Sequence, residues 1–198
     1  MQRVQEMRIF GLRLAFSGIV SVLSLTAGQM TAAQESALCD AKAVPAQVSE
    51  ALKSKFADWR PKQLSDMEAD DQQLWLKGPN GKACPGITIG HFESAKELSY
   101  ALLLVPKSEP TGGYKVVVFS KGPTGDVYTW KLLDHADGET YSGLVISKAD
   151  PGKYSDFEGT KSIQTKLDGV YLEWMEKGAV LYYWSASAGR YHRLRVSD

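Results

Sequence analysis

Apolar residues occur along most of the chain in short runs separated by turns rich in glycine and proline, which is typical of a β-rich protein. The two strongest runs after the N-terminus are Leu102–Val105 and Val116–Phe119. Within Val127–Leu133, side chains of different character alternate, as in a strand with one buried face. The central part of the chain therefore predicts strands at about 86–92, 98–105, 114–120 and 127–133.

The C-terminal part of the chain continues this pattern. Asp168-Gly169 lies between two apolar segments and is a two-residue signal for a tight hairpin. Further turns are expected at 176–178 and 187–189. These turns predict a meander of four antiparallel strands, at 162–167, 170–175, 179–185 and 190–196.

One segment of the chain has helical periodicity. Val48, Leu52 and Phe56 are spaced four apart and share one helical face, and Pro45 suits the first helical turn. We expect the helix to end at Trp59-Arg60-Pro61, because the residue before a proline is disfavoured in helical backbone.

Together these elements predict the α+β class with mainly β structure. The architecture would be an antiparallel meander sheet or a curved sandwich, with one N-terminal helix covering a face or an edge. Gln73–Lys77, just before a glycine- and proline-containing turn, predicts an additional short strand. Residues 34–198 show no long repeat and no low-complexity linker, so a single mainly-β domain is predicted. A split near residue 135 is the competing prediction.

Residues 1–33 have the features of a cleaved signal peptide. Arg3, Arg8 and Arg13 precede the apolar run Leu14–Ala27, and small residues at 31–33 provide a cleavage site. The apolar run is shorter than the stretch of about 20 residues that crosses a bilayer, so an uncleaved anchor is the less favoured alternative. The predicted location is periplasmic or secreted.

The charge balance limits the classes of partner. The chain has 23 basic and 23 acidic residues, and removal of the arginine-containing leader leaves a slightly acidic remainder. This balance favours neither nucleic acid nor an anionic membrane as a partner. No second long apolar segment follows the leader, so no membrane span is expected after cleavage. The expected partner is another envelope or secreted protein.

Cys39 and Cys84 are the only cysteines of the chain. An even number of cysteines in an exported protein favours a disulfide, which for a loop of this length stabilises the fold by about 4 kcal/mol in the chain-entropy treatment. The bond would tie the start of the exported part to the segment Cys84–Phe119. A reactive or metal-binding thiol is the alternative.

Residues 90–104 show a recognisable order of a glycine, a phenylalanine, a loop and an apolar strand. Gly90, Phe92 and the strand that starts near Tyr100 carry this order, which resembles the FG-GAP/VCBS type of repeat in secreted bacterial proteins. In that family, loop aspartates often bind calcium and several repeats build a propeller. The resemblance implies a loop-and-strand hairpin in a secreted domain, but not calcium binding or a propeller. A single copy is visible, and the positions of the family's aspartates hold His91, Glu93 and Ser94.

No metal or cofactor site is predicted. The histidines, His91, His135 and His192, lack the short ligand spacing of a zinc site. The acidic turn at 134–139 lacks the spacing of an EF-hand loop, which favours a solvated turn over a calcium site. No nucleophile elbow, P-loop or dinucleotide-binding glycine pattern occurs.

The irregular segment 134–160 contains a cluster of carboxylates. Asp150, Asp156 and Glu158 fall within residues 150–158, and paired carboxylates are the groups that hydrolyse glycosidic bonds. The Asp-Pro-Gly sequence at 150–152 is also typical of an exposed turn, which is the plainer interpretation. An envelope glycan hydrolase that uses the 150–158 carboxylates is therefore the alternative function.

Aromatic residues are frequent in the C-terminal half, outside any catalytic pattern. The strand Leu181–Trp184 has aromatic side chains on both faces, so one face can build the core while the other contacts a partner. Tyr191, Arg193 and Arg195 share a strand face, which suits an acidic partner or guards an edge strand with charge.

The sequence as a whole favours an exported, non-enzymatic binding protein of the bacterial envelope. The most concrete version is an inhibitor or immunity protein that occludes an envelope-acting enzyme. A sheet face and the loop 134–160 would contact the partner, and no catalytic residue is assigned. The candidate partner-binding residues are Tyr154, Asp156, Phe157, Glu158 and Tyr183.

Overall fold

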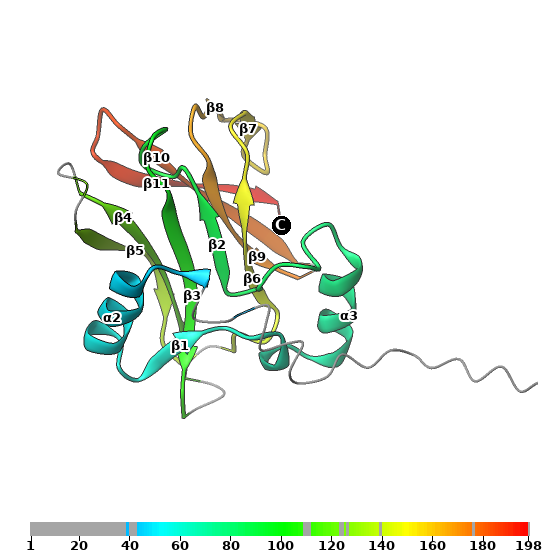
Figure 1. Cartoon of the computed structure of the whole chain (residues 1–198). Helices are drawn as coiled ribbons and strands as arrows, with labels where there is room; N and C mark the ends of the chain where they lie inside the picture. The colour runs from blue at the N-terminus through cyan, green and yellow to red at the C-terminus, as the bar shows by residue number, and fades with distance from the viewer. Residues whose placement is uncertain are drawn as a thin grey trace, which may run out of the picture.

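The chain folds into two antiparallel sheets that lie against each other (Figure 1). The structure is a computed structural model, and it describes residue 39 and residues 43–108, 112–122, 125, 127–138, 140–175 and 177–197. The predicted signal peptide at 1–33 lies outside the described residues. The mainly-β α+β sandwich that the sequence predicts is confirmed.

The first sheet, called sheet A, is organised around β3 (Ser99–Pro106). Strands β4 (Tyr114–Lys121) and β5 (Tyr128–Ala136) follow as successive antiparallel neighbours. Strands β1 (Trp59–Pro61) and β2 (Ile87–Gly90) pair with the other edge of β3, one after the other along its length. In the described part of the chain, β5 alone therefore forms the second edge of sheet A.

The second sheet, called sheet B, has the strand order β11-β10-β9-β6. Its last three strands, β9 (Gly169–Trp174), β10 (Gly178–Ser185) and β11 (Arg190–Ser197), form the antiparallel meander expected for that part of the chain. Strand β6 (Leu144–Ala149) completes the sheet beside β9.

The strands β7 (Lys153–Ser155) and β8 (Ser162–Gln164) form a separate two-stranded ribbon. The predicted hairpin between 162–167 and 170–175 is therefore wrong, because β8 pairs with β7 and β6 takes the place beside β9. Asp168 does not serve a tight turn; its carboxylate accepts a hydrogen bond from the backbone N–H of His91 over 2.7 Å. That bond ties the entry to β9 to the loop after β2.

The main core lies between the two sheets and draws on residues from both sides of position 135. Alternate residues of β3 and β4 point into it from sheet A, and alternate residues of β6, β9 and β10 meet them from sheet B. Its buried members include Ala101, Leu103, Val116, Val118, Leu144, Ile146, Val170, Leu172, Val180 and Tyr182.

Each sheet is covered on its outer face as well. Helix α2 (Ala46–Lys55) packs Val48 into a cluster with Leu102 of β3 on the outer face of sheet A. The ribbon covers the outer face of sheet B, where Tyr154 packs against a cluster that includes Leu181. Strand β3 is apolar at nearly every position because it is buried on both faces.

A second helix, α3 (Ala69–Lys77), stands where the sequence predicts a strand at Gln73–Lys77. The strand prediction is wrong, and so is the prediction of a single helix. Asp70 and Asp71 lie in the first turn of α3 and Lys77 in the last, an arrangement that stabilises the helix dipole.

Tertiary packing accounts for α3 better than local periodicity does. Trp75 is buried in a cluster with Leu64, Met67 and Val145, and its indole N–H donates to the carbonyl oxygen of Ala83 over 3.1 Å. The cluster joins α3 and a short 3-10 turn (Leu64–Asp66) to the edge of sheet B. No helix within the described ranges is long and apolar enough to cross a bilayer.

The predicted disulfide between Cys39 and Cys84 is confirmed. Its sulfur atoms lie 3.7 and 3.5 Å from the carbonyl oxygen of Lys62, the residue that follows β1. The amide of Lys62 donates to the carbonyl oxygen of Leu103 over 2.9 Å. The disulfide therefore fastens the N-terminal segment to the edge of sheet A where β1 and β2 meet β3.

Candidate functional site

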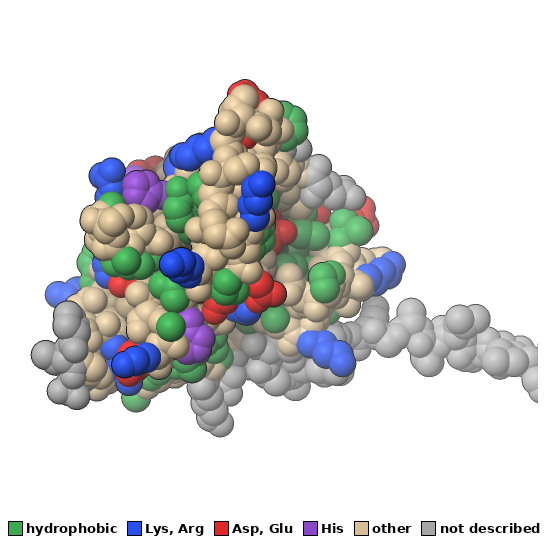
Figure 2. Space-filling view, turned by 90° about the horizontal axis from the view of Figure 1, so that it is seen from above, with side chains coloured by type: hydrophobic (Ala, Val, Ile, Leu, Met, Phe, Trp, Pro, Cys, Tyr) green, Lys and Arg blue, Asp and Glu red, His purple; other side chains and the backbone are tan. Residues whose placement is uncertain are grey.

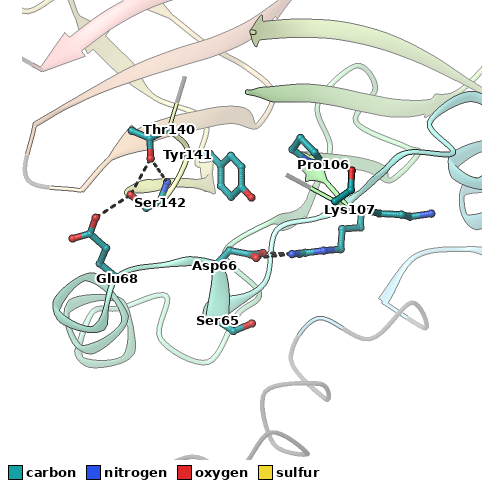
Figure 3. A pocket seen from close by; sticks show the side chains of 10 residues that line it. Ser65, Asp66, Glu68, Pro106, Lys107, Thr140, Tyr141 and Ser142 are labelled. Atoms are coloured by element: carbon teal, nitrogen blue, oxygen red, sulfur yellow. Dashed lines mark hydrogen bonds and ion pairs between the residues drawn. The ribbon is translucent and has the colours of Figure 1, made fainter. Parts of the chain in front are cut away.

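A polar hollow of 460 Å³ lies where the end of β3 approaches residues 140–142 (Figure 3). Arg60 and Asp66 form a two-pronged ion pair there, with both N–O distances at 2.6 Å. Burial alone would raise the pKa of Asp66, but its hydrogen bonds with Arg60 and the Gln63 amide outweigh burial and lower it. On another wall, Glu68 accepts a hydrogen bond from Ser142. Arg60, Asp66 and Glu68 thus all have partners within the walls of this hollow.

Lys62, next to this hollow, is a fully buried lysine. Its ammonium donates to the carbonyl oxygens of Tyr141, Ser142 and Leu144, the last two at 2.6 Å. Burial lowers the pKa of Lys62 to about 7, although the nearby carboxylate of Asp66 acts in the opposite direction. Through these three hydrogen bonds Lys62 links the end of β1 to residues 141–144, at the start of β6.

The five predicted partner-binding residues lie on the ribbon side of sheet B, but two of the aromatic ones pack internally. Tyr154 contacts the ring of Tyr171 edge-on with centres 6.1 Å apart, and Tyr183 stacks on His192 at 5.7 Å. Phe157 is 55% exposed, and Glu158 is exposed beside it. Tyr154, Asp156 and Tyr183 are half-buried, so Phe157 and Glu158 are the most exposed of the five.

Two of the carboxylates at 150–158 have partners close to them in sequence. One oxygen of Asp156 accepts from the amide of Lys161 at 2.9 Å, and the other from the hydroxyl of Thr160 at 2.7 Å. These hydrogen bonds lower the pKa of Asp156. The exposed Asp150 pairs with Lys148. A glycan hydrolase needs two carboxylates on either side of a cleft, and these local bonds do not provide that arrangement.

The three histidines are separated in the fold. His91 Nδ1 lies 3.3 Å from the carbonyl oxygen of Glu97, His192 stacks on Tyr183, and His135 is exposed on β5. Among the residues that the structure describes, no group of three or more His, Cys, Asp and Glu side chains could hold a metal ion.

The candidate binding surface is the open side of the sandwich, where β5 and β11 are the outermost strands of their sheets. Strand β5 pairs with β4, and no described strand pairs with its other edge. Trp130 and Leu132 project from β5 toward the α2 side and are 43% and 44% exposed. Phe56 contacts one part of the Trp130 ring edge-on at 5.1 Å. Phe56, at the C-terminal end of α2, thus covers part of Trp130, and the exposed remainder of Trp130 together with Leu132 forms an apolar strip along β5.

The face of β5 that points toward sheet B is polar at Lys131, between Trp130 and Leu132. Lys131 Nζ lies 2.8 Å from the carboxylate of Glu93 and 5.1 Å from the centre of the Trp184 ring. Trp184 in turn contacts the ring of Tyr191 edge-on at 5.1 Å. The Glu93 side chain is only 13% exposed, so this ion pair is largely shielded from water.

Three buried polar atoms lie beside this ion pair, namely Glu93 Oε1, Ser120 Oγ and Tyr191 OH. None of them reaches hydrogen-bond geometry with a described residue. They are nevertheless close enough to interact: burial first, and then Glu93, raises the pKa of Tyr191, while Ser120 opposes the rise. Buried polar atoms without partners are rare because they cost free energy. Since the ring of Tyr191 also packs against the main core, polar atoms are buried here at the margin of the core.

Three hollows follow one another along the open side. The first, of 340 Å³, lies at the ends of β9, β10 and β11; the second, of 270 Å³, lies between β5 and the start of β11. The third, of 680 Å³, lies between the loop after β2, the end of β4 and Trp184. The first and second hollows share Arg193, and the second and third share Lys131. Their cationic residues, here called the basic band, are Lys96, Lys121, Lys131, Lys177, Arg190, Arg193 and Arg195.

The basic band is a local charge asymmetry in a chain with equal numbers of basic and acidic residues. The carboxylates that line the three hollows, Glu93 and Glu97, are each paired with a lysine of the band, at 2.8 Å to Lys131 and 3.1 Å to Lys121. Figure 2, viewed from the end that carries the β10–β11 turn, shows Lys and Arg side chains interspersed with hydrophobic ones.

The sequence pointed to part of this surface. It placed Tyr191, Arg193 and Arg195 on one strand face, and the structure puts both arginines of that face in the walls of the hollows. The sequence patterns did not point to Glu93 or Lys131 as site residues. The visible signal was Lys131, the one charged residue in the alternating segment 127–133. Comparison with protein-family models, curated proteins and solved structures gives no match to this chain.

Proposed function

We propose that this protein is an exported, non-enzymatic binding protein of the bacterial envelope that holds an acidic protein partner on the basic band. The observation that carries the proposal is the row of three adjoining hollows with cationic walls, whose carboxylates are already neutralised by ion pairs. Complementary charge speeds association and excludes partners of like charge.

The composition of the open side supports a protein as the partner. The hollows combine cations with the large aromatic side chains of Trp174, Trp184 and Tyr191. Arginine, tryptophan and tyrosine are the residues that contribute most to binding energy in protein interfaces. The hollows also form an extended row, which suits an elongated contact better than one small molecule.

An envelope-acting hydrolase is the most specific partner that fits this surface. Glycan hydrolases carry paired carboxylates in their clefts, and a basic surface that covers such a cleft would neutralise and occlude them. The protein would then be an inhibitor or an immunity protein that protects the cell that exports it.

In-cell photo-crosslinking tests the proposal. A photoreactive amino acid replaces Arg190, at the centre of the basic band, and adducts are identified by mass spectrometry. We expect an acidic envelope protein in the adduct, and we expect Arg193→Glu together with Arg195→Glu to abolish it. The matched control, Lys53→Glu with Lys166→Glu, reverses two exposed charges away from the open side and should leave the adduct unchanged.

The purified pair then gives the strength of the interaction. We expect the band reversal to weaken affinity by about a hundredfold, in the range found for close interfacial charges, and we expect the control to keep wild-type affinity. Equal affinity of both variants, or an adduct that survives the band reversal, would overturn the proposal.

A further inference from the structure

The free edge of β5 gives the proposed binding surface a second feature, which is a row of backbone groups. Strand β5 runs from Tyr128 to Ala136 and pairs with β4 on one side only within the described part of the chain. A long edge strand presents unpaired N–H and C=O groups that can accept another strand. We infer that the partner binds as an added strand along β5, an inference that rests on the proposed function.

The two faces of this edge differ in chemistry. Trp130 and Leu132 are opposite Phe119 and Val117 in the β4–β5 register, so they lie on the α2 face. Lys131 is opposite Val118, whose side chain points into the inter-sheet core. The apolar strip therefore lies on one side of the edge, and the basic band on the other.

This arrangement specifies the chemistry of the occupant. Successive side chains of a strand point to opposite faces, so an added strand places every second residue toward the apolar strip and the others toward the basic band. The occupant is an extended segment in which acidic and apolar residues alternate. The register shift opposite Val116 and Val117 ends the regular part of the edge, which covers Tyr128–Leu132.

Lys131 makes the edge selective. Lys131 is paired with Glu93, but it shares the second hollow with Arg190 and Arg193, and no carboxylate is among the described residues that line that hollow. A charged inward face of an edge strand disfavours pairing with uncharged strands, which would desolvate these cations without compensation. The edge therefore favours acidic strands over apolar ones.

Peptide titration by NMR tests this mode of binding with defined probes. The first probe is a capped heptapeptide of alternating aspartate and valine; the second has the same composition with the aspartates and valines in separate blocks. The third is the alternating peptide with N-methyl groups on alternate amides, which removes the donors that a strand needs. Chemical shifts and hydrogen exchange of the β5 amides report where each peptide binds.

We expect the alternating peptide to slow exchange at β5, and the block and N-methylated peptides to bind at least about tenfold more weakly. Leu132→Asp, a change at an exposed side chain, should weaken the alternating peptide about tenfold, whereas the matched Leu74→Asp, at an exposed position of α3, should have no effect. Thermal unfolding of both variants confirms that they fold.

Strand addition is overturned if N-methylation leaves the affinity of the alternating peptide unchanged, or if Leu132→Asp has no effect on it. It is also overturned if the alternating peptide does not perturb the β5 amides at millimolar concentration. Those results would leave the proposed function intact wherever crosslinking to an acidic protein still depends on the basic band. Conversely, if crosslinking does not depend on the basic band, the proposed function is overturned, regardless of the peptide results.

Discussion

At the residue scale, Lys62 does the most to join separate parts of the fold. Its amide binds the carbonyl group of Leu103, its carbonyl oxygen lies against the disulfide, and its ammonium binds carbonyl groups between Tyr141 and Leu144. A side chain on Gly86 would collide with the Lys62 backbone, since the Cβ would lie 2.4 Å from its carbonyl oxygen. One residue thus holds the edge of sheet A, the N-terminal segment and the entry to sheet B.

Replacement of Lys62 by methionine should destabilise the protein by about 3 kcal/mol, because three buried carbonyl groups lose their donor while the volume is nearly kept. Urea unfolding of the wild type and Lys62→Met measures the difference. Lys53→Met is the matched control: Lys53 is 72% exposed and paired only with Glu50, so its loss should cost less than about 0.5 kcal/mol. Equal stability of the two variants would show that the Lys62 bonds contribute nothing.

The pKa of Lys62 predicts a pH dependence of stability. Because the pKa is lowered to about 7 in the folded chain from an ordinary 10.5, the unfolded chain binds a proton in this interval that the folded chain does not. The free energy of unfolding should therefore rise with pH from about 7 to 9, by at most about 1.4 kcal/mol per pH unit. Urea titrations across this range measure it. If the free energy of unfolding of Lys62→Met rises by the same amount over this pH range, the pH dependence arises from other titratable groups.

At the element scale, the ribbon depends on the turn that Asp156 closes. The backbone of this turn also reaches β11, where the amide of Phe157 donates to the carbonyl oxygen of Arg195 over 2.9 Å. The ribbon is thereby fixed over Leu181 and Leu194 as a lid on the outer face of sheet B. Asp156, one of the carboxylates that the sequence offered for catalysis, supports this turn of the ribbon.

Asp156→Ala should speed hydrogen exchange of the Lys161 amide, which loses its acceptor, and leave exchange in β9 and β10 unchanged. The wild-type amide should show a matching pH dependence. The pKa of Asp156 is lowered in the folded chain, so its stabilising effect is complete above the ordinary carboxyl pKa and is lost as pH falls through the lowered value. Glu158→Ala, a change two residues away, serves as the control. Slow exchange at Lys161 in Asp156→Ala would show that the turn holds without the carboxylate.

The elements that sequence patterns predicted well are those in which burial and periodicity agree. Strands β3 and β4 are apolar because both faces are buried, and α2 shows one apolar stripe because one face is buried. Helix α3 was missed because Leu74-Trp75-Leu76 has the length of a strand, and the partners of Trp75 come from distant segments. The pairing of β8 was missed because Asp168-Gly169 has turn chemistry, and the bond from His91 to Asp168 cannot be seen in local sequence.

At the scale of the whole molecule, the disulfide and the basic band are the two features with the widest reach. The cysteine count predicted the disulfide, since two cysteines allow only one pair. The basic band could not be predicted, because its members run from Lys96 to Arg195 and only the strand order brings them together. The sequence shows the arginine-rich face of β11, but not that β5 with Lys131 lies across from it.

Removal of the disulfide should destabilise the fold by about 4 kcal/mol, in line with a loop that spans 45 residues. Cys39→Ser with Cys84→Ser, compared with the wild type under oxidising conditions, gives this value by urea unfolding. Under reducing conditions the difference should vanish. A difference that persists in reductant would point to lost packing at these two buried positions and not to the crosslink.

The core that the two sheets share has a consequence for the order in which the chain is made. Residues up to Ala136 supply sheet A, but the residues that cover its inner face end only at Tyr182 of β10. At ribosomal rates of roughly 5–20 residues per second, Leu103, Val116 and Val118 remain uncovered for several seconds after their strands emerge. The nascent chain is therefore expected to be most prone to aggregation during that interval. The interval ends with β10, just before β11 adds the three arginines of the basic band.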